Sequence, residues 1–323
     1  MPIIGSFGAG SAGGYGQRKG GGVPFNIEYL VIGGGGNGGP QTDDTGAGGG
    51  FRTNVPGSTS GGGAPAEPSY EVITGVEYTI TVGAGAYGGG AGPLPRPGPF
   101  ARGGSSVFDT ITSLGGGSGG PAPSPAEYPG IRTGGSGAGR FNSPNYSGTP
   151  GQGYPGGNNG GAVEPYNGTA GGGGAGQAGN SGSSGSGGPG GAGQTSSITG
   201  SPTQYAGGGG GGSRPGGPQG TGGAGGGGAG NSTHQSAATP GTANTGGGGG
   251  CQGYNNQPPG NPYAIIAATG NGGSGFIALK MPSDFTAAFT PGVTATPNTS
   301  VPGYQIYSIT AAGPSDTVTF SKG

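Results

Sequence analysis

The chain contains 323 residues, of which 97 are glycine, and its formal net charge at pH 7 is −1. The glycines do not recur at every third position, which excludes a collagen triple helix, and the balance of 10 basic and 11 acidic residues excludes an electrostatic surface for nucleic acid. Cys251 is the only cysteine, so we expect neither a disulfide framework nor a cysteine-based zinc site.

Residues 1–24 place a few apolar side chains on a background of glycine and serine. We predict that this segment docks into another protein. The alternative is a loosely held terminus, which is common in proteins. The anchors of the docking segment would be Ile3, Ile4, Phe7 and Tyr15.

Four stretches in the first third of the chain have the pattern of β-strands. Residues 25–32 alternate and are apolar on both faces toward the end, as in a strand covered on two sides. Residues 51–55 are compatible with a short strand, and residues 70–82 alternate most clearly, with Gly75 predicting a bend or a tight turn. Residues 105–114 predict one further strand.

Residues 115–250 are of low complexity, and the β pattern returns in residues 263–280. Several strands run directly into glycine blocks, as in LVIGGGG and QYAGGGGGG. Residues 281–323 hold only 4 glycines, and FTAAF, GVTAT, YQIYSIT and DTVTF predict four short strands. Such a segment is marginal alone, so we expect it to pack on the main domain or on copies of itself.

The glycine blocks predict an interior made of backbone rather than of side chains. Glycine and proline make up about 40% of the chain, a share typical of low complexity, but only 7% of residues are charged, so the chain does not repel itself. Polyproline-II-like helices have three residues per turn and point their N–H and C=O groups outward. Glycine lets such helices approach on several sides and bond to one another.

These patterns together predict an all-β protein: a β-sandwich-like scaffold with an inserted polyglycine-II helix bundle and a small C-terminal β segment. We expect three parts, which are a docking segment (1–24), a glycine-rich β/polyglycine-II domain (25–280) and the C-terminal β segment (281–323). The longest apolar run, Tyr263 to Ala268, has six residues against about 20 for a membrane-spanning helix, and the start resembles no signal peptide. We therefore expect no membrane insertion.

No motif predicts an enzyme, a cofactor or a metal site. GxGxxG matches mean nothing in a chain this rich in glycine. His234, the only histidine, lies in a polar segment and is expected to be solvated, and Cys251 is expected to be a small buried side chain. Asp43 and Asp44 are expected to form a turn, because a calcium site needs six to eight oxygen ligands.

Aromatic side chains in the glycine-rich loops are the best candidates for binding another molecule. Tyrosine and phenylalanine offer a large contact area with little rotamer entropy. The alternative is that each ring covers the side of the glycine bundle. The candidates are Tyr128, Phe141, Tyr146, Tyr154, Tyr166 and Tyr254.

Strands and glycine blocks follow one another over residues 25–280 in the segments EYLVIGGGGNGG, YTITVGAGA, ITSLGGGSGG, QYAGGGGGG, NTGGGGG and GGSGFIALK. This order resembles the glycine-rich domain of bacteriophage tail-fibre and adhesin proteins, which are common in marine phages. The start, MPIIGSFGAGSAGGYG, is similar to that of several cyanophage virion proteins. A more distant similarity is to the glycine-rich extracellular region of the anaplastic lymphoma kinase receptor family. The chain lacks the cysteines and the membrane span of those receptors.

The resemblance implies a non-enzymatic virion protein, a tail fibre or surface-fibre adhesin located on the particle. Residues 1–24 would bind other virion proteins, and loops at the tip of the bundle would contact a host receptor or glycan. Fibres of this kind are often trimeric, so a homo-oligomer is possible. The alternative is an ice-binding or extracellular matrix protein built from the same helices, which would need a regular threonine or alanine face that the glycine blocks lack.

Overall fold

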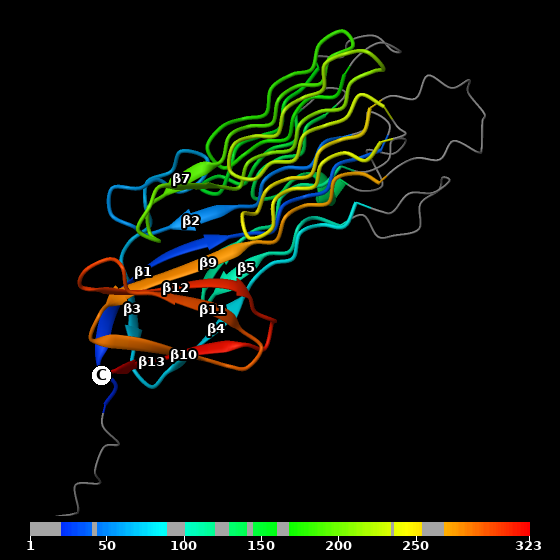
Figure 1. The fold of residues 1–323 in the computed structure, drawn as a ribbon. Helices are drawn as coiled ribbons and strands as arrows, with labels where there is room; N and C mark the ends of the chain where they lie inside the picture. Colours follow the sequence, from blue (N-terminus) through cyan, green and yellow to red (C-terminus); the bar gives the residue numbers. More distant parts are fainter. Residues whose placement is uncertain are drawn as a thin grey trace, which may run out of the picture.

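The computed structural model describes residues 21–40, 44–88, 101–119, 129–140, 145–159, 168–233, 236–253 and 268–323. Within these ranges the protein is all-β apart from one short helix, α1 (Pro129–Arg132). Two antiparallel sheets form one end of the molecule, and extended glycine-rich segments run side by side away from them (Figure 1). The predicted all-β class is confirmed.

The strands are arranged in two sheets and one separate hairpin, and all pairs are antiparallel. The first sheet has the order β11 (Thr294–Asn298), β12 (Tyr304–Ala311), β9 (Phe276–Pro282), β1 (Pro24–Ile32) and β2 (Phe51–Thr53), with β3 (Tyr70–Ile73) beside the first half of β1. The second has the order β10 (Phe285–Phe289), β13 (Thr317–Lys322), β4 (Glu77–Thr81), β5 (Ser106–Phe108) and β6 (Ile111–Ser113). The hairpin consists of β7 (Gln194–Ser196) and β8 (Thr203–Tyr205).

Strand β1 lies at the centre of the first sheet and contributes to two cores. The side chains of Ile27, Tyr29 and Val31 join the main core, which also receives side chains of the second sheet. Those of Leu30 and Ile32 point to the opposite face and join a second core. This double burial explains why β1 is apolar on both faces, as its sequence predicted.

The second core is closed by the β7–β8 hairpin. The ring of Tyr205 stacks on that of Phe276 from β9 with 5.3 Å between centroids, and Ile198 from the hairpin turn is buried beside them. The sequence predicted a strand where QYA precedes the glycine block, and β8 lies there. It predicted no strand at β7, because QTS is short and polar. The available signal was Ile198, an isolated large aliphatic residue in a run of small ones.

The C-terminal segment is part of both sheets. Strand β12 pairs with β9 and carries β11 at the sheet edge, while β13 pairs with β4 and carries β10. The side chains of Tyr307 and Phe320 are buried in the main core. The segment therefore packs on the main domain, the first of the two arrangements that its sequence left open, and its four predicted strands are all present.

Two predictions about where the chain turns or runs straight differ in outcome. The break at Gly75 is a tight turn between β3 and β4, with a left-handed φ of 78° at that glycine, as predicted. The single strand predicted over residues 105–114 was wrong, because the chain reverses between β5 and β6 at Asp109, whose φ is 49°. Aspartate tolerates this conformation better than most residues, and the Asp109 carboxylate accepts a hydrogen bond from the Tyr70 hydroxyl.

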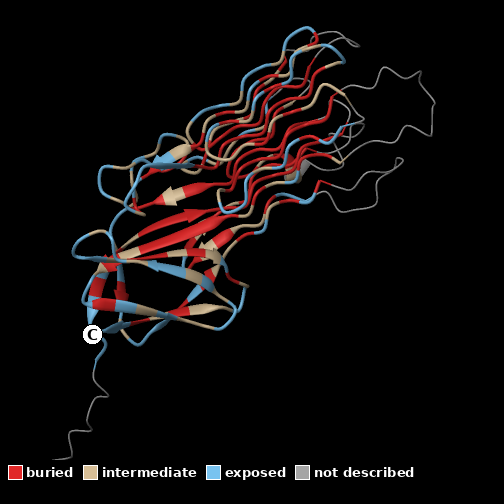
Figure 2. Cartoon of the chain, viewed as in Figure 1, coloured by how far each residue is buried: buried red, intermediate tan, exposed pale blue. Residues whose placement is uncertain are grey.

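The remaining glycine-rich chain forms an array of extended segments, many of them buried (Figure 2). We call this array the glycine bundle; it comprises residues 33–39, 44–50, 83–88, 115–119, 168–176, 187–193, 207–213, 246–253 and 268–275. At most bundle glycines an added Cβ would lie within 3.0 Å of the backbone of a neighbouring segment. Only glycine therefore fits at this spacing.

Hydrogen bonds within the glycine bundle rotate among neighbours with a period of three residues. In segment 207–213, the amides of residues 207, 210 and 213 donate to residues 225, 228 and 231 of one neighbouring segment. The amides of residues 208 and 211 donate to residues 191 and 188 of a second neighbour, and the amide of Gly209 donates to Gly46 of a third. The donor–acceptor distances are 2.8 to 3.1 Å. Segment 33–39 repeats the pattern with other neighbours. Each segment is thus surrounded by bonded neighbours instead of lying in a flat sheet.

The carboxylate of Asp316 ties together two turns that connect the sheets, one between β10 and β11 and the other between β12 and β13. It accepts hydrogen bonds from the Thr290 hydroxyl and the Gly313 amide, each at 2.7 Å. The hydrogen bond from Thr290, followed by those from Gly313 and Gly292, lowers the pKa of Asp316 below its ordinary value of 3.8. The ionised form is therefore preferred in the folded protein.

We predict that Asp316→Asn lowers the melting temperature at neutral pH, since the neutral amide cannot replace both carboxylate contacts. A lowered pKa contributes stability above the ordinary carboxyl pKa, and that contribution is lost as the pH falls through the lowered value. Thermal melts of both proteins from pH 7 to pH 2 check this. A difference in melting temperature that stays constant over the whole range would contradict the assignment.

Candidate functional site

The far end of the glycine bundle, which we call the distal end, is where the chain repeatedly turns. The amide of Gly39 donates to Asp44 at 2.8 Å, and the carbonyl of Gly39 accepts from the amide of Gln252 at 3.1 Å. The amide of Gly119 donates to Asn37 at 2.8 Å in the same region. Residues that border the undescribed ranges lie at this end (Figure 1). Those ranges are 41–43, 89–100, 120–128, 141–144, 160–167, 234–235 and 254–267.

The opposite end, which we call the basal end, is formed by the two sheets and holds the first described residues together with the last ones. The Thr74 amide donates to Val23 at 3.1 Å, and the Gly75 amide donates to Phe320 at 2.9 Å. The Gly323 amide also bonds within this region, to Asp284. The molecule therefore has two chemically different ends, separated by the length of the glycine bundle (Figure 1).

Two arginines, an aspartate and a tyrosine form a cluster at the distal end. Arg132, at the last position of α1, is only 3% exposed and makes an ion pair with Asp44 through Nε. The guanidinium carbons of Arg132 and Arg140 lie over the ring of Tyr146, at 5.6 Å and 4.7 Å from its centroid. Such cation–π contacts strengthen when they are shielded from water. The cluster joins Asp44 to the region of residues 132–146, which is distant from it in the sequence.

Tyr146 is half-buried within this cluster and stays protonated well into the alkaline range. Burial, and after it the negative charge of Asp44, raises the pKa of the Tyr146 phenol above its ordinary value of 10. The positive charges of Arg132 and Arg140 act in the opposite direction. Tyr146 is only partly buried, so it both supports the distal end and contributes to its surface.

The two described aromatic candidates direct their side chains to different regions, although the main chains of both flank Gly137. Tyr146 lies at the distal end, whereas the hydroxyl of Tyr154 lies beside Gly63 in the loop between β2 and β3, at the sheet end of the bundle. Sequence reasoning missed Tyr87, whose side chain is 68% exposed. Its neighbour Gly88 bonds to Asn271 near the distal end. The signal was available, because Tyr87 also stands alone between glycines.

The other predicted site residues lie outside the described ranges. They are the docking residues Ile3, Ile4, Phe7 and Tyr15, and the contact candidates Tyr128, Phe141, Tyr166 and Tyr254.

Of the residues considered for chemistry, Cys251 and Asp44 lie within the described ranges. Cys251 is fully buried, with its Sγ 3.3 Å from the carbonyl oxygen of Gly39, which confirms the predicted small buried side chain. His234 and Asp43 fall outside the described ranges. Among the described residues, no group of three or more His, Cys, Asp or Glu side chains is placed to hold a metal ion. In the same part of the chain, no helix has the length and apolar character needed to cross a membrane.

Comparison with known proteins identifies one family. A family model described as a glycine-rich domain matches residues 23–282, which is most of the chain. No curated protein and no solved structure matches the chain.

Proposed function

The chain belongs to the glycine-rich domain family across residues 23–282, and from this premise we propose that it is a non-enzymatic structural protein of a virion. In this proposal it is a tail fibre or surface-fibre adhesin on the particle. Residues 1–24 attach it to other virion proteins, and the distal end presents loops to a host receptor or glycan. The observation that carries the proposal is the separation of the two ends by a bundle with a backbone interior.

The glycine bundle is, in this proposal, a bundle of polyglycine-II helices. Such helices repeat every three residues and have no internal hydrogen bonds. The rotation of amide partners with a period of three in segments 207–213 and 33–39 supports this assignment. A bundle bonded in several directions resists bending more than a single sheet and offers few side chains for chemistry. Both properties suit a stiff spacer.

The direction of the molecule fits attachment at one end and contact at the other. The first described residues lie at the basal end, so residues 1–20 connect there, while the undescribed loops that hold most aromatic candidates connect at the distal end. The resemblance of the strand and glycine pattern to phage tail-fibre proteins supports the same arrangement.

We predict that deleting residues 1–20 prevents incorporation into particles. Val23 and the strands are untouched by the deletion, so the remaining chain keeps its fold. Quantitative mass spectrometry of purified particles, with the purified variant checked by circular dichroism, measures the outcome. Incorporation of a folded, truncated chain at the normal level would refute the docking role.

Contact with the host is tested separately at the distal end. We expect Tyr146→Ala and Tyr166→Ala to reduce binding of the purified protein to host cells about tenfold or more, as for interface aromatics. Tyr154→Ala is the matched control if the contact is confined to the distal end, since the Tyr154 hydroxyl lies beside Gly63. Normal binding by both Tyr146→Ala and Tyr166→Ala would remove these residues from the contact surface.

A further inference from the structure

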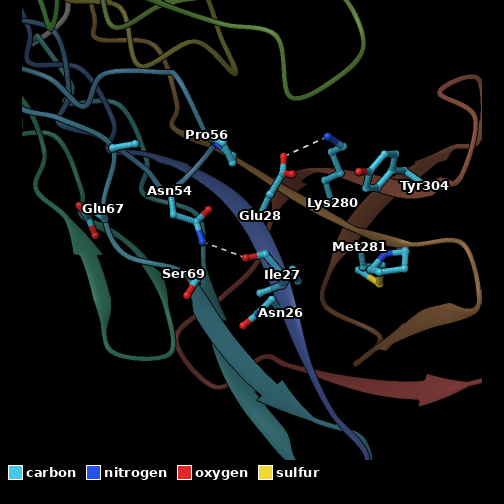
Figure 3. A pocket seen from close by; sticks show the side chains of 12 residues that line it. Asn26, Ile27, Glu28, Asn54, Pro56, Glu67, Ser69, Lys280, Met281 and Tyr304 are labelled. Atoms are coloured by element: carbon cyan, nitrogen blue, oxygen red, sulfur yellow. Dashed lines mark hydrogen bonds and ion pairs between the residues drawn. The ribbon is translucent and has the colours of Figure 1, made fainter.

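A pocket of about 360 Å³ lies on the outer face of the first sheet, where β1 passes beneath the loop between β2 and β3. Glu67 and Ser69 stand on one side of β1, and Lys280 and Tyr304 stand on the other (Figure 3). This volume is at the lower end of the range of about 300 to 1,000 Å³ that is usual for small-molecule sites. The pocket therefore has room for a small ligand.

The main-chain groups of β1 beside the pocket are already bonded. Strand β1 changes partner here, from β3 to β2. The side chain of Asn54 fills the gap: its Oδ1 accepts from the Tyr29 amide at 2.7 Å, and its Nδ2 donates to the Ile27 carbonyl at 2.8 Å. A peptide that adds a strand to a sheet needs free main-chain groups. The pocket does not offer them at this point.

The charges of the lining are balanced in pairs. The Lys280 ammonium donates to the Glu28 carboxylate at 3.0 Å. The Glu67 carboxylate accepts two hydrogen bonds from the Arg52 guanidinium, at 2.6 and 2.8 Å, and one from the Tyr29 hydroxyl at 2.5 Å. A charged ligand would have to compete with one of these pairs. A neutral ligand leaves both intact.

Several polar groups of the lining remain available. Within the described residues, the side chains of Asn26, Ser69 and Tyr304 make no hydrogen bond, and they provide an amide and two hydroxyls, which both donate and accept. The ring of Tyr304 is held by the Lys280 ammonium, 4.0 Å from its centroid, and is 38% exposed. Further apolar surface comes from Pro56, Ala66 and Pro282.

We propose that this pocket binds a neutral saccharide of one or two sugar rings. A sugar presents hydroxyls that donate and accept, which match the free polar groups, and C–H faces that pack on an aromatic ring and on apolar side chains. The balanced charges favour an uncharged sugar over an acidic or basic one, and the Asn54 bonds disfavour a peptide. The pocket lies on the sheets and not at the distal end, so it is a site separate from the proposed host-contact loops.

The test uses the full chain with lactose, maltose and cellobiose as probes, each titrated to about 20 mM and followed by saturation-transfer NMR. We expect at least one to bind with a Kd of about 1 mM, typical of a small shallow site. Tyr304→Ala and Asn26→Ala should each weaken that binding about tenfold. Tyr304→Phe, which keeps the ring, separates the loss of stacking from the loss of the hydroxyl.

Tyr87→Ala is the matched control, because it removes an exposed aromatic ring far from the pocket and should leave binding unchanged. Since Asn26 is exposed, its variant keeps the fold even if Tyr304→Ala unfolds. The proposal is overturned if none of the three disaccharides binds, if binding is the same in Asn26→Ala and wild type, or if a glucuronate disaccharide or a short peptide binds more tightly than all three.

Discussion

Gly209→Ala is expected to lower the free energy of unfolding by about 3 kcal/mol or more, the upper range for overpacking a rigid interior. An alanine Cβ at this position would lie within 3.0 Å of the Gly249 carbonyl oxygen, and the obstacle is backbone that cannot rotate away. The segment would have to separate from its neighbours and lose the bond from the Gly209 amide to Gly46. Chemical denaturation of both proteins measures the difference.

Gly313→Ala is the matched control. It adds the same methyl group, but the nearest atom to its Cβ is a carboxylate oxygen of Asp316 at 3.5 Å, an ordinary van der Waals contact, and its φ is not left-handed. We expect a change within about 0.5 kcal/mol. If Gly209→Ala were tolerated as well as the control, the segments would not be packed at backbone contact.

Phe320→Ala is expected to lower the free energy of unfolding by about 3 to 5 kcal/mol, the usual cost of emptying a buried phenylalanine site. Its ring is fully buried between the two sheets and packs against Phe25 and Tyr78, with centroids 5.6 and 5.7 Å away. Phe25 is in the first sheet and Tyr78 is in the second, so the cavity would open where the sheets meet. Urea unfolding followed by tyrosine fluorescence measures the loss.

Ser321→Ala tests whether the effect comes from the core. Ser321 is the next residue of β13 and is exposed, with one hydroxyl contact to Thr286, so we expect a change below about 0.5 kcal/mol. The unfolding transition of Phe320→Ala should remain single, because the C-terminal strands belong to both sheets. A separate early transition for residues 281–323 would contradict the shared core.

The strands could be predicted because their side chains carry the pattern. Alternation marked β4 and the four C-terminal strands, since one face of each packs on the main core, and apolar residues on both faces marked β1. Strand β7 and the hairpin it forms with β8 could not be found in this way, because the burial of the hairpin depends on Ile198 and Tyr205 meeting Phe276, which is more than 70 residues away in the sequence. Asp109 was missed for a similar reason, since a single left-handed residue leaves no periodic signal.

The order of segments in the glycine bundle could not be predicted at all. Glycines have no side chain by which one neighbour differs from another, so the sequence indicates that backbone bonding is available but not which segments pair. The distal cluster is a similar case. Asp44 lies far from Arg132 and Tyr146 in the sequence, and only the bundle brings it to them. For the candidate site, the sequence predicted an aromatic surface, and the structure adds the charges around Tyr146.

Amide hydrogen exchange across residues 168–176 and 207–213 measures the backbone interior most directly. Most of these amides donate hydrogen bonds at 2.8 to 3.2 Å, and none of these residues is exposed. We predict protection comparable to that of β1 and β9, because opening requires the bundle to separate. Exchange as fast as in an unstructured peptide would contradict a glycine bundle held together by its main chain.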